Sequence, residues 1–77
     1  MNLRVITEEK EILNAEVQSV TLPGEVGEMT ILPGHTLLLA TLSKGKISYT
    51  TSKGTEHIMI DGGTAEVARD KIVCLSR

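Results

Sequence analysis

Few residues of this chain have side chains that could do chemistry, and their spacing does not group them into a recognisable site. The two histidines, His35 and His57, have no cysteine, histidine or aspartate cluster around them at metal-ligand spacing. No serine lies in the Gly-x-Ser-x-Gly motif of hydrolases. Residues 24–27 are not followed by the Gly-Lys-Ser or Gly-Lys-Thr of a phosphate-binding loop. We therefore expect a protein that is not an enzyme and that holds no metal or cofactor.

A lysine near the end of the sequence suggests one alternative chemistry. Asp70-Lys71 is similar to the Asp-Lys pair of lipoyl and biotinyl carrier domains, which are acidic β-sandwiches with the modified lysine exposed on a hairpin. In those domains the lysine lies near the middle, and a second half-sandwich follows it. Only six residues follow Lys71. The carrier domain is therefore the second choice.

The composition argues against several other classes of protein. Eight basic and ten acidic residues give a net charge of −2, and Tyr49 is the one aromatic residue. The chain thus lacks the basic patch and the stacking side chains of nucleic-acid binders, oligonucleotide-binding barrels included. The longest apolar runs, such as residues 37–40, are too short to cross a membrane, and the first residues show no signal-peptide pattern. We expect a cytoplasmic chain that does not insert into the membrane. Cys74, the one cysteine, cannot form an internal disulfide and lies in an apolar run that predicts burial.

The order of short strand-like runs and turn residues predicts the fold class. The length, 77 residues, allows one core, so we expect a single domain over residues 1–77. Glycine-containing turns separate short runs rich in β-branched residues, which is typical of an all-β sandwich or barrel. The expected strands are residues 3–7, 12–13, 15–22, 28–32, 36–42, 46–51, 56–61, 64–68 and 72–75. The expected turns include residues 43–46, 51–54, 62–63 and 69–71. The pattern predicts an all-β fold of about 8–10 short strands.

The densest turn chemistry lies in residues 22–35. Pro23-Gly24 and Pro33-Gly34 bracket a short strand that begins near Glu28. Proline sets φ for the first turn position and glycine supplies a positive φ at the second, so each pair predicts a tight turn. A short strand held at both ends is typical of a segment that presents a binding surface.

The same segment resembles the N-terminal β-sandwich domain of the epsilon subunit of the bacterial F-type ATP synthase. That family has Leu-Pro-Gly-x-x-Gly-Glu, then Pro-Gly-His and a leucine-rich strand, which match residues 22–28, 33–35 and 37–39. Residues 3–10 are similar to the family's first strand and turn. Asp61-Gly62-Gly63 with Glu66-Val67 is similar to its Ser-Gly-Gly and Glu-Val pattern. The resemblance covers residues 2–76, and it implies a two-sheet antiparallel β-sandwich of about 8–10 short strands.

The resemblance implies a non-catalytic central-stalk subunit that locks the gamma subunit to the c-ring, so that ion-driven rotation is coupled to ATP synthesis. It implies gamma and the c-ring as partners, a peripheral place on the cytoplasmic face of the bacterial membrane, and a monomer when isolated. Family members commonly continue into a C-terminal pair of helices that inhibits ATP hydrolysis. The sequence stops where the sandwich ends, so we expect a chain without that helical domain.

The resemblance also implies which residues contact each partner. On the ring side these are Glu28, Met29 and Thr30, although composition alone makes Glu28 only a surface acid beside a turn. On the gamma side they are Thr7, His35, Thr36 and Leu38. Within residues 37–39 we expect Leu37 and Leu39 to face one side of a strand and Leu38 the other. We leave open whether Leu39 faces the core.

Overall fold

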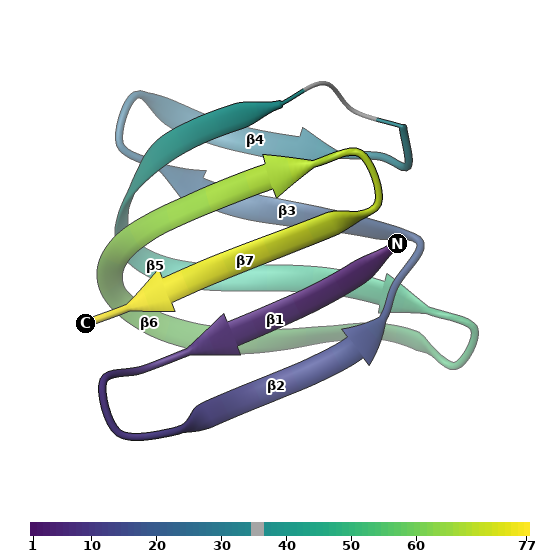
Figure 1. The fold of residues 1–77 in the computed structure, drawn as a ribbon, viewed down its shortest axis with the longest axis horizontal. Helices are drawn as coiled ribbons and strands as arrows, with labels where there is room; N and C mark the ends of the chain where they lie inside the picture. The colour runs from purple at the N-terminus through teal and green to yellow at the C-terminus, as the bar shows by residue number, and fades with distance from the viewer. Residues whose placement is uncertain (35–36) are drawn as a thin grey trace.

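The computed structural model describes residues 1–34 and 37–77, and every regular element in that part of the chain is a β-strand (Figure 1). There are seven strands: β1 (Asn2–Ile6), β2 (Glu11–Glu16), β3 (Ser19–Gly24), β4 (Gly27–Ile31), β5 (Leu38–Thr51), β6 (Gly54–Ala68) and β7 (Lys71–Ser76). They are hydrogen-bonded in the order β2-β1-β7-β6-β5-β3-β4. The all-β prediction is confirmed. The arrangement differs from the predicted two-sheet sandwich of about 8–10 short strands in three respects. There are seven strands, they form one continuous sheet, and β1 pairs with β7 in parallel whereas the other pairs are antiparallel.

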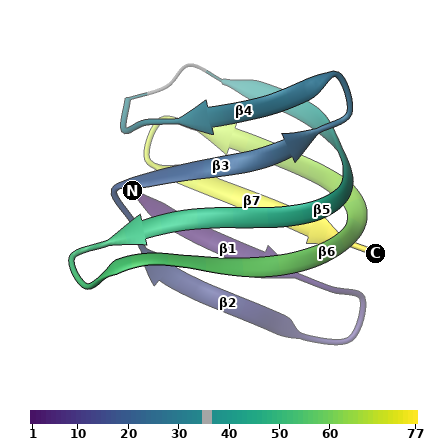
Figure 2. The same ribbon diagram turned by 180° about the vertical axis from the view of Figure 1, so that it is seen from behind.

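The continuous sheet folds over on itself, because β5 and β6 are long and curved (Figures 1 and 2). Layer A contains β2, β1, β7, the second half of β6 and the first half of β5. Layer B contains the first half of β6, the second half of β5, β3 and β4. Layer A faces the viewer in Figure 1 and layer B faces the viewer in Figure 2.

Two of the predicted turns are the bends of these long strands. Residues 43–46 and 62–63 lie opposite each other in the middle of the β5–β6 pair, where Leu42 pairs with Gly63 and Lys44 with Asp61. Gly62 and Gly63 are buried and have positive φ, 102° and 145°. A Cβ atom on Gly63 would lie only 1.9 Å from the carbonyl oxygen of Leu75. Glycine lets the strand bend here without a chain reversal, so four expected short strands form two long ones.

Another predicted strand, residues 15–22, is divided between the two layers. β2 ends at Glu16 and β3 begins at Ser19. In the link, the Val17 amide donates to the carbonyl oxygen of Met1 at 2.7 Å in layer A. The next amide, that of Gln18, donates to the carbonyl oxygen of Thr50 at 2.7 Å in layer B. The chain therefore crosses from one layer to the other within two residues.

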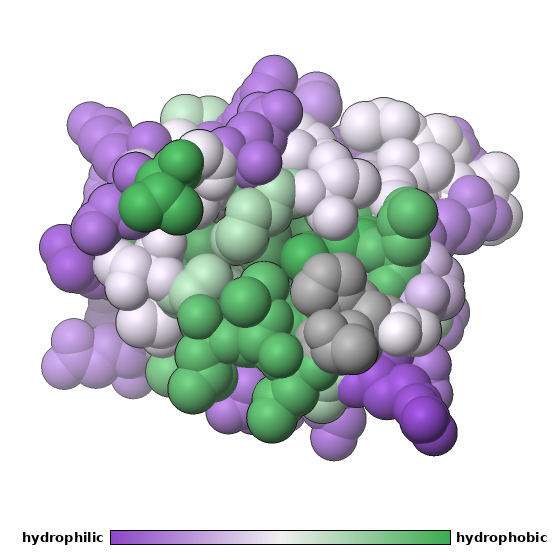
Figure 3. Space-filling view, turned by 90° about the horizontal axis from the view of Figure 1, so that it is seen from above, coloured by the Kyte–Doolittle hydropathy of each residue, from purple (hydrophilic) through white to green (hydrophobic). Residues whose placement is uncertain are grey.

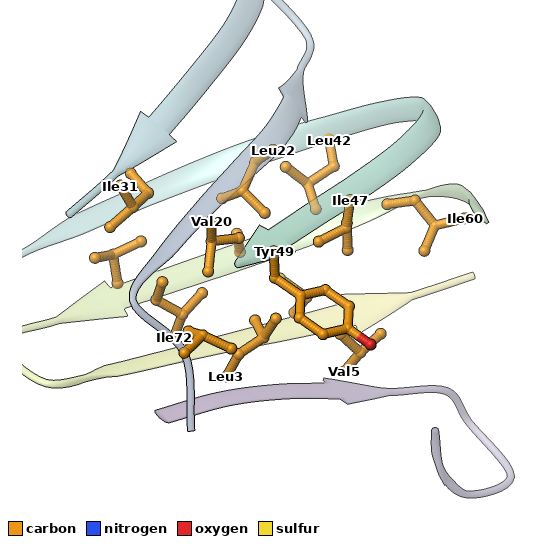
Figure 4. Close-up of a cluster of buried hydrophobic side chains, with 14 residues drawn as sticks. Leu3, Val5, Val20, Leu22, Ile31, Leu42, Ile47, Tyr49, Ile60 and Ile72 are labelled. Carbon is orange, nitrogen blue, oxygen red and sulfur yellow. The ribbon is translucent and has the colours of Figure 1, made fainter. Parts of the chain in front are cut away.

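The core between the layers is almost entirely aliphatic (Figure 4). Alternate residues of several strands point inward, as period-two alternation requires. The buried set is Leu3, Val5, Val17, Val20, Leu22, Ile31, Leu42, Ile47, Tyr49, Ile60, Ala65, Val67, Ile72 and Cys74. Cys74 is buried as predicted, and this burial raises the pKa of its thiol to about 12. Burial also raises the pKa of Tyr49, and the carboxylate of Glu56 on the neighbouring strand adds to that rise.

Candidate interaction surfaces

The described residues offer surfaces rather than a chemical site. In residues 1–34 and 37–77 no three histidine, cysteine, aspartate or glutamate side chains are grouped so that they could hold a metal ion. The same part of the chain contains no helix long and apolar enough to cross a membrane. Lys71, the residue behind the carrier-domain alternative, is exposed at the start of β7, directly after a turn. The hairpins and the two outer faces of the sandwich differ in their chemistry.

The β3–β4 hairpin carries the residues expected to meet the ring. Pro23 pairs with Glu28 and Gly24 with Gly27, so the reversal is made by Glu25 and Val26. The predicted Pro23-Gly24 turn is therefore displaced to the two residues that follow. A Cβ atom on Gly24 would lie 2.5 Å from the carbonyl oxygen of Gly27, which explains why a glycine ends this strand.

Two further contacts place this hairpin. The Glu25 amide donates to the carbonyl oxygen of Thr41 at 2.9 Å and so ties the hairpin to β5. Val26 at the hairpin tip is fully exposed. The other predicted turn, Pro33-Gly34, is confirmed, with φ of 85° at Gly34.

Glu28, Met29 and Thr30 do not share one surface. Glu28 and Thr30 are exposed, whereas the Met29 side chain is half-buried and packs against the core. The Thr30 hydroxyl is hydrogen-bonded to the hydroxyl of Thr21 at 3.1 Å. Of the three predicted ring contacts, Glu28 is the one with a charged, exposed side chain beside the hairpin tip.

The residues expected on the gamma side are spread more widely. Thr7 closes the β1–β2 turn, where its amide donates to the carbonyl oxygen of Lys10 at 2.8 Å. That turn lies at the opposite end of the molecule from the Pro33-Gly34 turn in both ribbon views. His35 and Thr36 lie outside the described residues. Leu38 is half-buried and packs against the core.

Leu37 and Leu39, by contrast, are exposed by 75% and 73%, which confirms that they and Leu38 face opposite sides. The Leu39 side chain therefore faces solvent and not the core.

The outer face of layer A is apolar and hollowed. Two cross-strand rows form it: Leu39, Glu66 and Val73 in one, and Thr41, Thr64 and Leu75 in the other. We call these six residues the apolar face. They line most of a depression of about 480 Å³, and Leu75 is 53% exposed.

This face extends toward the β3–β4 hairpin. A second hollow of about 280 Å³ shares Leu39 and Thr41 with the first and reaches Val26 and Met29. Viewed from the side of β4 and the start of β5, hydrophobic side chains form a nearly continuous patch (Figure 3). Contiguous exposed apolar surface of this kind is typical of an interaction site.

The sequence did not identify Val73, Leu75 and Thr64 as surface residues. The run of residues 72–75 reads as one apolar strand, yet Ile72 and Cys74 are buried while Leu75 is exposed. Strict alternation along β7 could have identified Val73 and Leu75 as surface residues, since a strand with one covered face exposes every second residue.

The outer face of layer B has the opposite character. Hydroxyl groups stand in cross-strand pairs: Thr21 with Thr30 at 3.1 Å, and Thr50 with Thr55 at 3.3 Å. The Ser48 hydroxyl lies 3.0 Å from Nδ1 of His57, which its strand places directly opposite. We call these six residues the hydroxyl face. Its polar groups are hydrogen-bonded to one another.

Comparison with known proteins agrees with this architecture. Residues 1–77 match the family described as ATP synthase, Delta/Epsilon chain, beta-sandwich domain. An ATP synthase epsilon chain of Syntrophotalea carbinolica is 35% identical over 97% of this chain and 54% of its own length. One from Helicobacter pylori is 37% identical over 99% of this chain and 62% of its own length. The chain thus spans little more than half of these relatives.

Solved structures show the same fold. A chain in the Euglena gracilis mitochondrial ATP synthase, solved as OSCP/F1/c-ring, superposes with a TM-score of 0.88 at 26% identity, over 96% of this chain and 48% of that one. A chain of the Tetrahymena thermophila central stalk and c-ring gives a TM-score of 0.79 over 99% of this chain and 62% of that one. At 17% identity, the second shows likeness of fold alone. The matching family and the shared sandwich together show that this chain belongs to the β-sandwich domain family of the ATP synthase delta and epsilon chains.

Proposed function

We propose that this chain is a non-catalytic adaptor of the central stalk of an ATP synthase, which fixes the gamma subunit to the c-ring. The observation that carries the proposal is the presence of two adjoining exposed surfaces of different chemistry on one scaffold: the apolar face of layer A and the charged β3–β4 hairpin of layer B. An adaptor needs two binding surfaces and a rigid body between them. The matched chain of the Euglena structure comes from an assembly that contains a c-ring, which supports the same role.

The ring side of the adaptor is the β3–β4 hairpin. Its exposed carboxylate, Glu28, and the fully exposed Val26 project beside the turn. A charged group at the rim of an interface sets orientation and electrostatic complementarity more than it adds affinity. The polar loops of the ring would meet Glu28 there, and the hydrogen bond from Glu25 to Thr41 would hold the hairpin in place.

The gamma side of the adaptor is the apolar face, with Leu39 and Leu75 as its largest exposed side chains. A stable interface of standard size buries roughly 800 Å² on each partner, and an exposed apolar centre is the usual anchor of such an interface. The exposure of Leu39 favours it over Leu38 as the gamma contact. The complex would hold the chain peripherally at the face of the membrane that carries the catalytic head.

Reconstitution with epsilon-depleted ATP synthase membranes tests the proposal. The wild-type chain is expected to bind and to restore ATP-driven proton pumping. The Glu28→Lys variant should keep its melting temperature and its binding to isolated gamma but lose pumping, because its attachment to the ring is weakened. The matched control is Glu56→Lys, which makes the same charge change far from the hairpin in β6. If the wild-type chain binds neither gamma nor the ring, the adaptor role is wrong.

A further inference from the structure

Glu66 is the one charged residue of the apolar face. It lies between Leu39 on β5 and Val73 on β7 in the same cross-strand row, and Thr64 and Leu75 belong to the next row. Glu66 is one of the residues that line the depression of about 480 Å³. A carboxylate in the middle of an apolar depression is an unusual feature, because such surfaces are depleted of charge at their centre.

The described part of the chain does not supply a counter-ion for Glu66. Within residues 1–34 and 37–77 the ion pairs are those of the Met1 amine with Glu16 and of Arg4 with Glu11. Arg4 stands two strands away along the same row, where Glu11 engages it at 3.3 Å. Lys71, two residues before Val73, does not come within 4 Å of Glu66 either.

We propose that the partner covering the apolar face carries one lysine or arginine directly opposite Glu66, surrounded by aliphatic side chains that fill the depression. The inference rests on the proposed function, in which this partner is the gamma subunit. It adds the chemistry by which the two surfaces recognise each other: an apolar contact with a single charge pair at its centre.

The free-energy balance supports this choice of partner. Covering the face removes water from the Glu66 carboxylate, and the effective cost for an unpaired ion is several kcal/mol. The neighbouring Leu39, Val73 and Leu75 cannot compensate this cost, and Thr41 and Thr64 offer at most neutral hydroxyl donors. A cation on the partner forms a charge-assisted hydrogen bond with the carboxylate and offsets the loss.

The same arrangement gives specificity and a fixed orientation. Any apolar surface could cover Leu39 and Leu75, but one without a cation would leave the carboxylate buried and unpaired. Such a mismatch rejects wrong partners and wrong registers. Glu66 would therefore act as a specificity determinant, whereas the leucines supply the contact area.

Binding of purified gamma to four forms of the chain tests the inference. These are the wild type, Glu66→Gln, the double variant Leu39→Ser with Leu75→Ser, and Glu56→Gln as the matched control on the other half of β6. Losing one partner of a buried charge pair costs about 2–5 kcal/mol, so Glu66→Gln should raise Kd by about 30-fold or more. The control should bind as the wild type does, and melting curves should show all four folded.

The outcomes separate the two proposals. If the double leucine variant binds weakly but Glu66→Gln binds like the wild type, the charge pair does not exist while the gamma surface stands. If neither variant loses affinity, the apolar face is not the gamma surface and both proposals fail. A charge exchange is the decisive step: one lysine-to-glutamate or arginine-to-glutamate change in gamma should restore binding to Glu66→Lys. If none restores it, the inference is wrong.

Discussion

The two outer faces of the sandwich share β5 and β6 but differ in how their side chains are satisfied. On the hydroxyl face, Thr21 bonds to Thr30, Thr50 to Thr55 and Ser48 to His57, so these groups already have partners within the chain. On the apolar face, Leu39 and Leu75 are exposed, and no described cation lies within 4 Å of Glu66. The comparison indicates that a candidate binding surface is recognised by exposed apolar side chains and by a charged group that has no partner within the described chain.

The largest expected effect comes from a change at the bend of β5 and β6, because this bend places both strands in both layers. Gly63→Ala should destabilise the fold by more than about 3 kcal/mol, because the new Cβ would meet the Leu75 carbonyl oxygen and the backbone has a positive φ. Gly54→Ala is the control. Its φ is also positive, 122°, but the added Cβ meets open space, so the loss should be about 1–3 kcal/mol. Urea unfolding measures the loss of stability in both variants. Equal losses would show that the backbone around Gly63 shifts to accommodate the added Cβ and that the close approach to Leu75 carries no extra cost.

A second prediction compares the two sides of β5 itself. Leu42 is buried in the core, so Leu42→Ala should cost about 2–5 kcal/mol of unfolding free energy. Leu39→Ala changes an exposed side chain and should cost no more than about 0.5 kcal/mol, although it should weaken binding to gamma. Chemical denaturation combined with a binding assay separates the two effects. Comparable losses of stability would mean that Leu39 packs inward after all.

A third prediction uses the thiol that β7 points into the core. Burial raises the pKa of Cys74 from its ordinary value of 9.0 to about 12, so the folded state holds this proton more tightly than the unfolded state. The resulting stability is present below pH 9 and is lost as the pH rises toward 12. The loss should reach about 1 kcal/mol by pH 10. Urea melts between pH 8 and pH 10 measure it, and Cys74→Ala should remove this part of the slope.

The smallest expected effect concerns the hydroxyl face. Thr21→Val removes one cross-strand hydroxyl pair but keeps a β-branched side chain, so stability should change by less than about 1 kcal/mol. Binding to gamma should be unchanged, because the proposed gamma surface is the apolar face on the other layer. Calorimetry and the binding assay check both statements. A clear loss of affinity for gamma would make the hydroxyl face an interface as well.

The sequence predicted the fold class and the places of most strands, because alternation and turn residues are local signals. The burial of Cys74 and the opposite orientations of Leu38 and Leu39 follow from the same period of two. Residues 43–46 and 62–63 were expected to be turns because glycine breaks strands locally. Only the pairing of β5 with β6 shows that the two stretches bend together.

The candidate surfaces were less predictable. The parallel contact of β1 with β7 joins the two ends of the chain and has no local signal. The apolar face depends on that sheet order, because it brings Leu39, Glu66 and Val73 into one row from three separate strands. The turn at Glu25-Val26 was misplaced by two residues because the Pro-Gly pair stays in the ladder opposite Glu28 and Gly27.

The bend at Gly62 and Gly63 has a mechanical consequence for a part that would transmit torque. In a sandwich of two separate sheets, a force that slides one sheet over the other is resisted mainly by the non-directional packing of aliphatic side chains between them. Here the hairpin in layer B and the apolar face in layer A are joined by unbroken strands and their backbone hydrogen bonds. A sideways force on one surface would therefore be transmitted to the other through the backbone of β5 and β6. Such a domain would resist sliding of one layer over the other, and it would bend most easily at Gly62 and Gly63.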